Sequence, residues 1–145
     1  MLFLKVVTAR DRHLGEDNPS TLKSVHSLAS TYRRQGNFKK AEELFLRAVC
    51  GRKSVLGESH RDTIASLEGL GRVYQKQAKW EDAERMELEL WDIRKKLLED
   101  DHPSTRGSMR TLSRIYLHQK RRKEAEKFEA LLKEQSSTVS LVWFG

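Results

Sequence analysis

Five histidines and one cysteine are the side chains whose chemistry could serve catalysis or metal binding. A transition-metal site needs several imidazole, thiolate or carboxylate ligands that converge on one point. His13, His26 and His118 have no cysteine or carboxylate at ligand spacing. His60 and His102 each stand just ahead of a predicted helix, which indicates a linker or capping role. The sequence therefore predicts no metal site.

Cys50 lacks a neighbouring base that would activate it as a nucleophile. The chain also lacks a phosphate-binding glycine loop, a Gly-x-Ser-x-Gly turn and a His-Glu-x-x-His helix motif. Acidic pairs such as Glu42 and Glu43 are surrounded by lysine and arginine, as is typical of solvated charge. These observations predict a protein that is not an enzyme and needs no cofactor. A single cysteine favours a reducing compartment, the cytoplasm, with the nucleus as the alternative.

Positive charge is the remaining chemical signal. The formal net charge is +7, which favours an acidic peptide, a nucleic acid or an anionic surface as partner. The densest basic run, residues 120–123, is a nuclear address, a nucleic-acid contact or an exposed charged turn, and its shortness favours the turn. Trp80, Trp91 and Trp143 are not interleaved with basic residues as a base-stacking surface requires, and we interpret Trp80 as core. No stretch approaches the roughly 20 apolar residues of a membrane span.

The elements that position these side chains repeat every 42 residues. A fixed period of this size indicates stacked helical units that bury their apolar faces against one another. Within each period the apolar residues recur at steps of three and four, then a turn follows, then a second amphipathic stretch. The columns in register are Leu14/Leu56/Leu98, Thr21/Thr63/Thr105, Leu28/Leu70/Leu112, Tyr32/Tyr74/Tyr116, Gln35/Gln77/Gln119, Ala41/Ala83/Ala125 and Glu42/Glu84/Glu126.

The pattern predicts an all-α protein in which a first helix, A, and a second helix, B, alternate. After residue 135 the period is lost and an apolar tail follows. This tail could cover the last helix, mediate self-association or be a loose chain end, and we favour the loose end. Both chain ends carry apolar residues that could drive self-association. The predicted A helices are 20–35, 62–77 and 104–119, and the B helices are 39–56, 81–98 and 123–135, after an unpaired helix at 2–14. The corresponding organisation is a half repeat at 1–15, repeats at 16–57, 58–99 and 100–135, the last degenerate, and a tail at 136–145.

The columns resemble those of tetratricopeptide repeats. A large apolar residue is followed by Leu, a small residue, Tyr, a turn and the Ala of helix B. The linker from Leu56 to Thr63 resembles that of the 42-residue kinesin light chain variety, which also occurs in repeat tails of fungal signalling nucleotidases. HEAT and armadillo repeats, the rival architecture, lack this order. The resemblance spans residues 2–135 and implies a right-handed superhelical stack, an α-solenoid, that binds proteins. The columns concerned are Val25/Leu67/Met109, Ala29/Gly71/Ser113 and Tyr32/Tyr74/Tyr116.

Two departures from the kinesin light chain pattern affect the functional prediction. The asparagine pair that the resemblance would place on helix A is replaced by His26-Ser27, Glu68-Gly69 and Arg110-Thr111, so light-chain cargo recognition does not carry over. The third unit has Lys120 where the first has the turn residue Gly36, and Arg122 where the first has Phe38, which suggests a degenerate terminal repeat.

In this repeat class helix A builds most of the concave wall, so the resemblance and the register together predict a basic groove. We expect a non-catalytic scaffold or adaptor that binds an acidic segment there, with a ligand aromatic or leucine anchored beside Gly69 and Gly71. The alternatives are nucleic-acid binding by the same surface and a structural or oligomerising segment of a longer protein. The predicted groove residues are Lys23, His26, Ser30, Arg33, Arg34, Glu68, Arg72, Gln75, Lys76, Arg110, Arg114 and His118.

Overall fold

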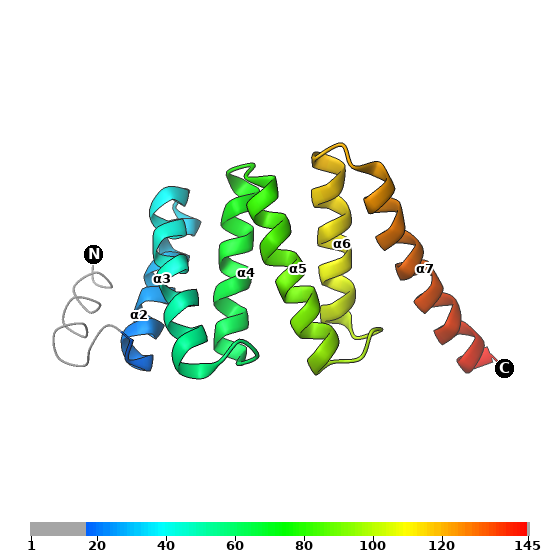
Figure 1. The fold of residues 1–145 in the computed structure, drawn as a ribbon, viewed down its shortest axis with the longest axis horizontal. Coiled ribbons are helices and arrows are strands. Elements are labelled where there is room, and N and C mark those ends of the chain that lie inside the picture. Colours follow the sequence, from blue (N-terminus) through cyan, green and yellow to red (C-terminus); the bar gives the residue numbers. More distant parts are fainter. Residues whose placement is uncertain (1–16, 145) are drawn as a thin grey trace. The chain divides into compact units, whose positions relative to one another are not determined.

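Six α-helices and no strand make up the described part of the chain, residues 17–144 of a computed structural model (Figure 1). Side chains are described from residue 17 to residue 135. The A helices begin and end within one residue of the prediction, and so do the first two B helices. The helices are α2 (Pro19–Arg34), α3 (Phe38–Leu56), α4 (Arg61–Lys76), α5 (Trp80–Leu97), α6 (Pro103–His118) and α7 (Arg122–Phe144).

The chain forms two compact units. The first ends at Lys79 and contains α2, α3 and α4, and the second begins at Trp80 and contains α5, α6 and α7. The boundary falls between α4 and α5, the two helices that the period assigns to one repeat. Each unit is described by itself below.

The A helices begin with side-chain caps that occupy one repeat column. The Oδ1 of Asn18 accepts a hydrogen bond from the backbone N–H of Ser20 at 2.9 Å. His60 and His102 do the same through Nδ1, at 3.0 and 3.1 Å, for the N–H groups two residues ahead. A side-chain acceptor at this position satisfies a donor that the first helical turn leaves unpaired. The predicted capping role of these two histidines is therefore confirmed.

Each A helix ends in the same turn, although only the first has glycine there. Gly36, Ala78 and Lys120 have φ values of 79°, 56° and 61°, in the left-handed region. The next residue's N–H then bonds to the carbonyl of the tyrosine five positions back, at 2.8 to 2.9 Å. This is the hydrogen bond of a Schellman cap. Lys120 therefore preserves the turn geometry, and the sequence signal of degeneracy there does not correspond to a different structure.

Each core follows the repeat columns. In the first unit Leu28, Leu70 and Phe45 are fully or almost fully buried, and Phe45 packs against the α4 backbone at Gly69. In the second unit Leu112, Tyr116 and Ala125 form a cluster onto which Leu88, Trp91 and Phe128 pack. The alanine that recurs in every repeat has a small side chain, so adjacent helices can approach closely there and bury it. Ala41, Ala83 and Ala125 are at most 1% exposed.

Two polar contacts between helices recur with the 42-residue period. The Nη1 of Arg52 donates to Ser66 Oγ at 2.9 Å, and Arg94 Nη1 donates to Ser108 Oγ at 2.7 Å. Both bonds join a B helix to the A helix that follows it. Arg52, a residue that is 5% exposed, also donates to the Asp62 carbonyl at 2.9 Å, so its guanidinium has two acceptors. Buried charge requires such partners, and these bonds fix helix B against its successor.

The second recurring contact is an ion pair. Lys79 Nζ lies 3.0 Å from Glu42 in the first unit, and Arg121 Nη1 lies 2.8 Å from Glu84 in the second. Both glutamates face a cation at the turn 37 residues later.

Two chain-end predictions meet different outcomes. The predicted helix α7 end at residue 135 was wrong, because α7 continues to Phe144. Residues 136–138, Ser-Ser-Thr, are modest helix formers but contain no glycine or proline that would stop propagation. The predicted half repeat at 1–15 lies outside the described residues.

Candidate functional site

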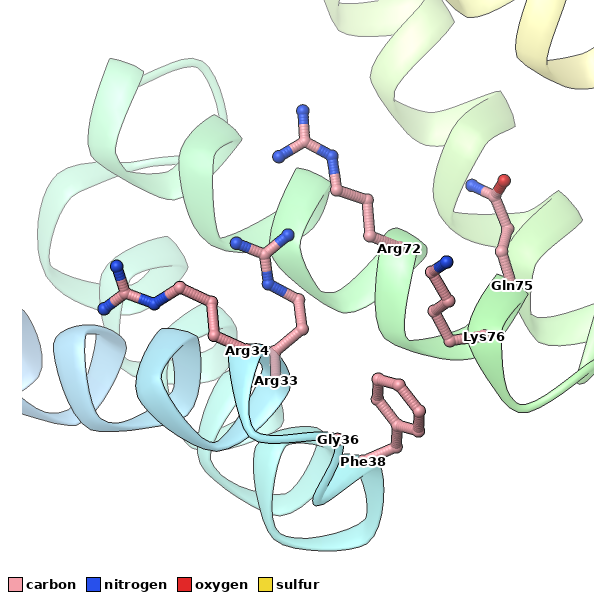
Figure 2. Close-up of a pocket in the computed structure, with 7 residues that line it drawn as sticks. All are labelled: Arg33, Arg34, Gly36, Phe38, Arg72, Gln75 and Lys76. Atoms are coloured by element: carbon pink, nitrogen blue, oxygen red, sulfur yellow. The ribbon is translucent and has the colours of Figure 1, made fainter.

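The first unit contains a pocket of about 430 Å³ lined by the ends of α2 and α4 and the turn before α3. Figure 2 shows Arg33 and Arg72 reaching from the two helices into the same space, with Gln75 and Lys76 farther along α4. The seven lining residues include four cations and no acid. They are Arg33, Arg34, Gly36, Phe38, Arg72, Gln75 and Lys76.

The local fold explains why these side chains meet. Arg33 and Arg34 occupy the last turn of α2, and Arg72 and Lys76 lie one helical turn apart on α4. Helices α2 and α4 contact each other within the unit. The C-terminal turn of α2 therefore lies beside the second half of α4.

Arg33 is the most constrained of the four cations. Burial lowers the pKa of its guanidinium, and the positive charges of Arg72 and Arg34 lower it further. Its Nε is buried and has no hydrogen-bond partner among the described residues. An unpaired buried donor costs stability, and like charges held together also repel. An anion in the pocket would relieve both penalties.

The absence of ion pairs here contrasts with other cations of the same chain. Lys79, Arg121 and Lys96 each lie within 3.0 Å of a carboxylate oxygen. Among residues 17–135, none of the four pocket cations has a carboxylate within salt-bridge distance. The pocket therefore concentrates positive charge that the rest of its unit does not neutralise.

His26, a predicted groove residue, is half-buried and has packing partners. Its ring meets Phe45 edge to face at a centroid distance of 5.4 Å, and Nδ1 lies 3.0 Å from Ser66 Oγ. Burial lowers its pKa from 6.5 to about 4, and the charges of Arg52 and Arg33 add to this effect. His26 is therefore neutral at physiological pH and adds no positive charge to the site.

The remaining predicted residues do not line this pocket. In the first unit Lys23 is exposed, and Ser30 and Glu68 are half-buried. Arg110, Arg114 and His118 belong to α6 in the second unit, where all three are exposed. The first unit thus assembles five of the predicted groove residues in one pocket: Arg33, Arg34, Arg72, Gln75 and Lys76.

His118 and Trp80 form a stacked pair within the second unit. Their ring centroids are 4.1 Å apart and the planes differ by 4°. Trp80 is half-buried, so the prediction that it is a core residue was only partly right. Its π surface is covered by an exposed imidazole that the sequence placed in the groove.

Sequence reasoning missed two features of the first unit. Phe38 lines the pocket beside the cations, and its position directly after the turn was the available signal. The sequence also placed an anchor gap at Gly69, but the Phe45 ring already fills that space. A Cβ built at Gly69 would lie 2.4 Å from Phe45 Cε1. The predicted anchor site at Gly69 was therefore wrong.

Other kinds of site find no support in the described residues. Residues 17–135 contain no group of three histidine, cysteine or acidic side chains placed to hold a metal ion. Cys50 is a free, exposed thiol. No helix within the described region has the length and apolar character to cross a membrane.

Comparison with known proteins agrees with this architecture. A family model described as tetratricopeptide repeat matches residues 25–96. No curated protein sequence matches the chain. A crystal structure of nearly identical TPR-like repeats, from a kinesin light chain-like protein of Podospora anserina, covers 95% of this chain at 28% identity with a TM-score of 0.81. A variant of that protein covers 94% at 29% identity with a TM-score of 0.84.

The chain spans 65% of the length of each of those two structures. BtubC (BKLC) of P. vanneervenii shares the fold at 16% identity, with a TM-score of 0.81 over 95% of this chain and 55% of its own. The helix order, the recurring small and aromatic columns and the family match agree with one another. Residues 25–96 belong to the tetratricopeptide repeat family, and the repeats of the chain are similar to those of kinesin light chain-like proteins.

Proposed function

We propose that the chain is a non-catalytic protein-binding module that holds an acidic peptide segment against the basic pocket of its first unit. Tetratricopeptide repeats generally serve protein–protein interaction, which supports the binding role. The observation that carries the proposal is the grouping of Arg33, Arg34, Arg72 and Lys76 around one pocket without an acidic residue. Guanidinium groups bind carboxylates through paired hydrogen bonds, which orient the ligand as well as attract it.

The repeat register, the single cysteine and the net charge extend the proposal to a second arginine, a cellular compartment and a competing function. Arg114 lies one repeat after Arg72 at the equivalent, exposed position of the second unit, and we propose that it binds acidic groups there in the same way. The single exposed cysteine fits a reducing compartment, so we propose the cytoplasm or the nucleus. Nucleic-acid binding by the same positive surface is the competing function, because a net charge of +7 attracts phosphate backbones as well.

Panning a random peptide library on the full chain tests the proposal. We expect enrichment of segments rich in Asp and Glu. Substituting Arg72→Glu and Lys76→Glu together should weaken binding by about tenfold or more, since close charge pairs at an interface are replaced by repulsion. The thermal midpoint should change little, because both residues are exposed.

A charge-matched control separates the groove from general electrostatics. Arg122 and Lys123 are exposed at the start of α7, and changing both to Glu alters the net charge by the same amount. Equal losses in the two double variants would contradict the groove proposal. Tighter binding to duplex DNA than to any peptide, with a steep salt dependence, would favour the nucleic-acid function.

A further inference from the structure

The charge of the pocket exceeds what one carboxylate can balance. Four cationic side chains line a space of about 430 Å³, which is within the range of about 300–1,000 Å³ usual for small-ligand pockets. A carboxylate has one negative charge and pairs with one guanidinium fork at a time. It would leave the other pocket cations close together and unneutralised.

A phosphoryl monoester matches the pocket better. It carries a charge of about −1.5 to −2 near neutral pH and offers three terminal oxygens as acceptors. Arg33 and Arg72 approach the pocket from different helices, so each could bind a different pair of oxygens on one phosphoryl group (Figure 2). Lys76 would supply a further point charge from α4.

Two further observations favour a phosphorylated side chain over a nucleic-acid backbone. A phosphodiester carries only one negative charge, and backbone binding needs cations spread along a track. Here the unpaired cations are gathered in one pocket of the first unit, beside the half-buried ring of Phe38. An aromatic wall next to a cationic cluster suits the apolar part of a peptide side chain that carries the phosphoryl group.

We propose that this pocket is a phosphoryl-monoester site that recognises a phosphorylated serine, threonine or tyrosine side chain within the acidic segment. The inference rests on the proposed function, because it names the group that the basic pocket prefers. Arg33 and Arg72 bind the phosphoryl oxygens, Arg34 and Lys76 add charge, and Phe38 contacts the flanking part of the ligand. Phosphorylation of the partner then controls its binding to this chain.

The test uses the full chain and four degenerate peptide pools that differ only in the central residue, which is serine, phosphoserine, phosphotyrosine or glutamate. Fluorescence anisotropy measures the affinity of each pool. We expect at least one phosphorylated pool to bind about tenfold more tightly than the serine pool and several-fold more tightly than the glutamate pool. This preference should decline as the pH falls below about 6, where the phosphoryl group takes up its second proton.

Variants locate the site. Arg33→Gln with Arg72→Gln should abolish the preference for phosphorylated pools. Arg33→Lys with Arg72→Lys should lose most of it despite retaining the charge, because lysine lacks the planar fork. The control Arg122→Gln with Lys123→Gln removes the same charge elsewhere and should leave the preference intact.

A measurement on the unsubstituted chain does not depend on how the variants fold. Titration with phenyl phosphate should shift the Nε–Hε resonances of Arg33 and Arg72 at lower concentration than benzoate does. Equal response to both compounds would overturn the assignment.

The outcomes also separate this inference from the function on which it rests. If the glutamate pool binds as tightly as the phosphorylated pools, the acidic-segment function stands and the phosphoryl site is wrong. Failure of every pool to bind contradicts both proposals. Retention of the phosphoryl preference by the Arg33→Gln, Arg72→Gln variant, or competition by duplex DNA at equal phosphate concentration, would also overturn the site.

Discussion

Gly69 provides a sharp test of how the first unit packs. A methyl group added there would lie 2.4 Å from Phe45 Cε1, 2.6 Å from Cζ and 3.0 Å from Cδ1. Ordinary contacts begin near 3.4 Å, so the ring would have to move by about 1 Å or more. Phe45 is 0% exposed, so its ring is enclosed by neighbouring atoms that would have to move with it. Overpacking of this kind costs about 1–3 kcal/mol, and three close ring atoms place Gly69→Ala in the upper part of that range.

Helix propensity acts in the opposite direction. Replacing a mid-helix glycine by alanine stabilises a helix by about 1 kcal/mol, so we expect Gly69→Ala to destabilise the chain by about 1–2 kcal/mol in total. Gly107 is the matched control, because it lies inside α6 and a Cβ there meets nothing within 4 Å. Its counterpart one repeat earlier is Ala65. Gly107→Ala should therefore stabilise by about 0.5–1 kcal/mol.

Urea denaturation followed by circular dichroism measures both variants. The two unfolding midpoints should move in opposite directions. Combining Gly69→Ala with Phe45→Leu should remove the penalty, since leucine lacks the Cε1 and Cζ atoms that collide, and the double-mutant cycle should show coupling. If Gly69→Ala stabilises the chain as Gly107→Ala does, the packing of Phe45 against α4 is wrong.

Three further predictions concern caps, turns and protonation. His102→Ala should lose about 1 kcal/mol in urea denaturation and His102→Asn should not, because Asn18 makes the same cap in the first repeat. Lys120→Gly should raise the thermal midpoint, since φ of 61° strains a residue with a side chain, whereas Gly36→Ala should lower it. The pKa of His26 falls from 6.5 to about 4 on folding, so the unfolded chain binds the proton more tightly. The contribution of neutral His26 to the free energy of unfolding should be fully present above pH 6.5 and should decline between pH 6.5 and 4. The decline should be less than about 1.4 kcal/mol per pH unit, because the ring is only partly buried. Unfolding midpoints across this range should fall less in His26→Gln, and an equal fall would contradict a neutral His26.

The period and the caps were enough to predict the helices. Periodic apolar columns, a proline in the first turn of two A helices (Pro19 and Pro103) and the position of each turn place element boundaries within a residue or two, because each is a local signal. The C-terminal end of α7 was predicted wrongly because a helix usually ends at a glycine or proline, whereas residues 136–138 only lower the helix propensity.

The site could be predicted only in part. The register identified Arg33, Arg72 and Lys76, since equivalent helix positions face the same way. It could not show that Phe45 fills the space at Gly69 or that His26 is packed and neutral, because both depend on side chains contributed by other helices. Periodicity specifies which face a residue occupies, whereas packing decides what remains open on that face.

The recurring contacts also bear on how such a chain can change length through gene duplication or loss. The partners of each bond sit in fixed columns, so Glu42 and Glu84 are interchangeable, and so are Lys79 and Arg121. Removal of one 42-residue period between Glu42 and Arg121 would leave them 37 residues apart, the spacing both native pairs have. The breakpoint need not coincide with a repeat boundary. Recombination at matching positions therefore keeps these recurring contacts paired, although a breakpoint between Phe45 and Gly69 would place Thr111 against the Phe45 ring, so the sites at which such an array can lengthen or shorten are restricted.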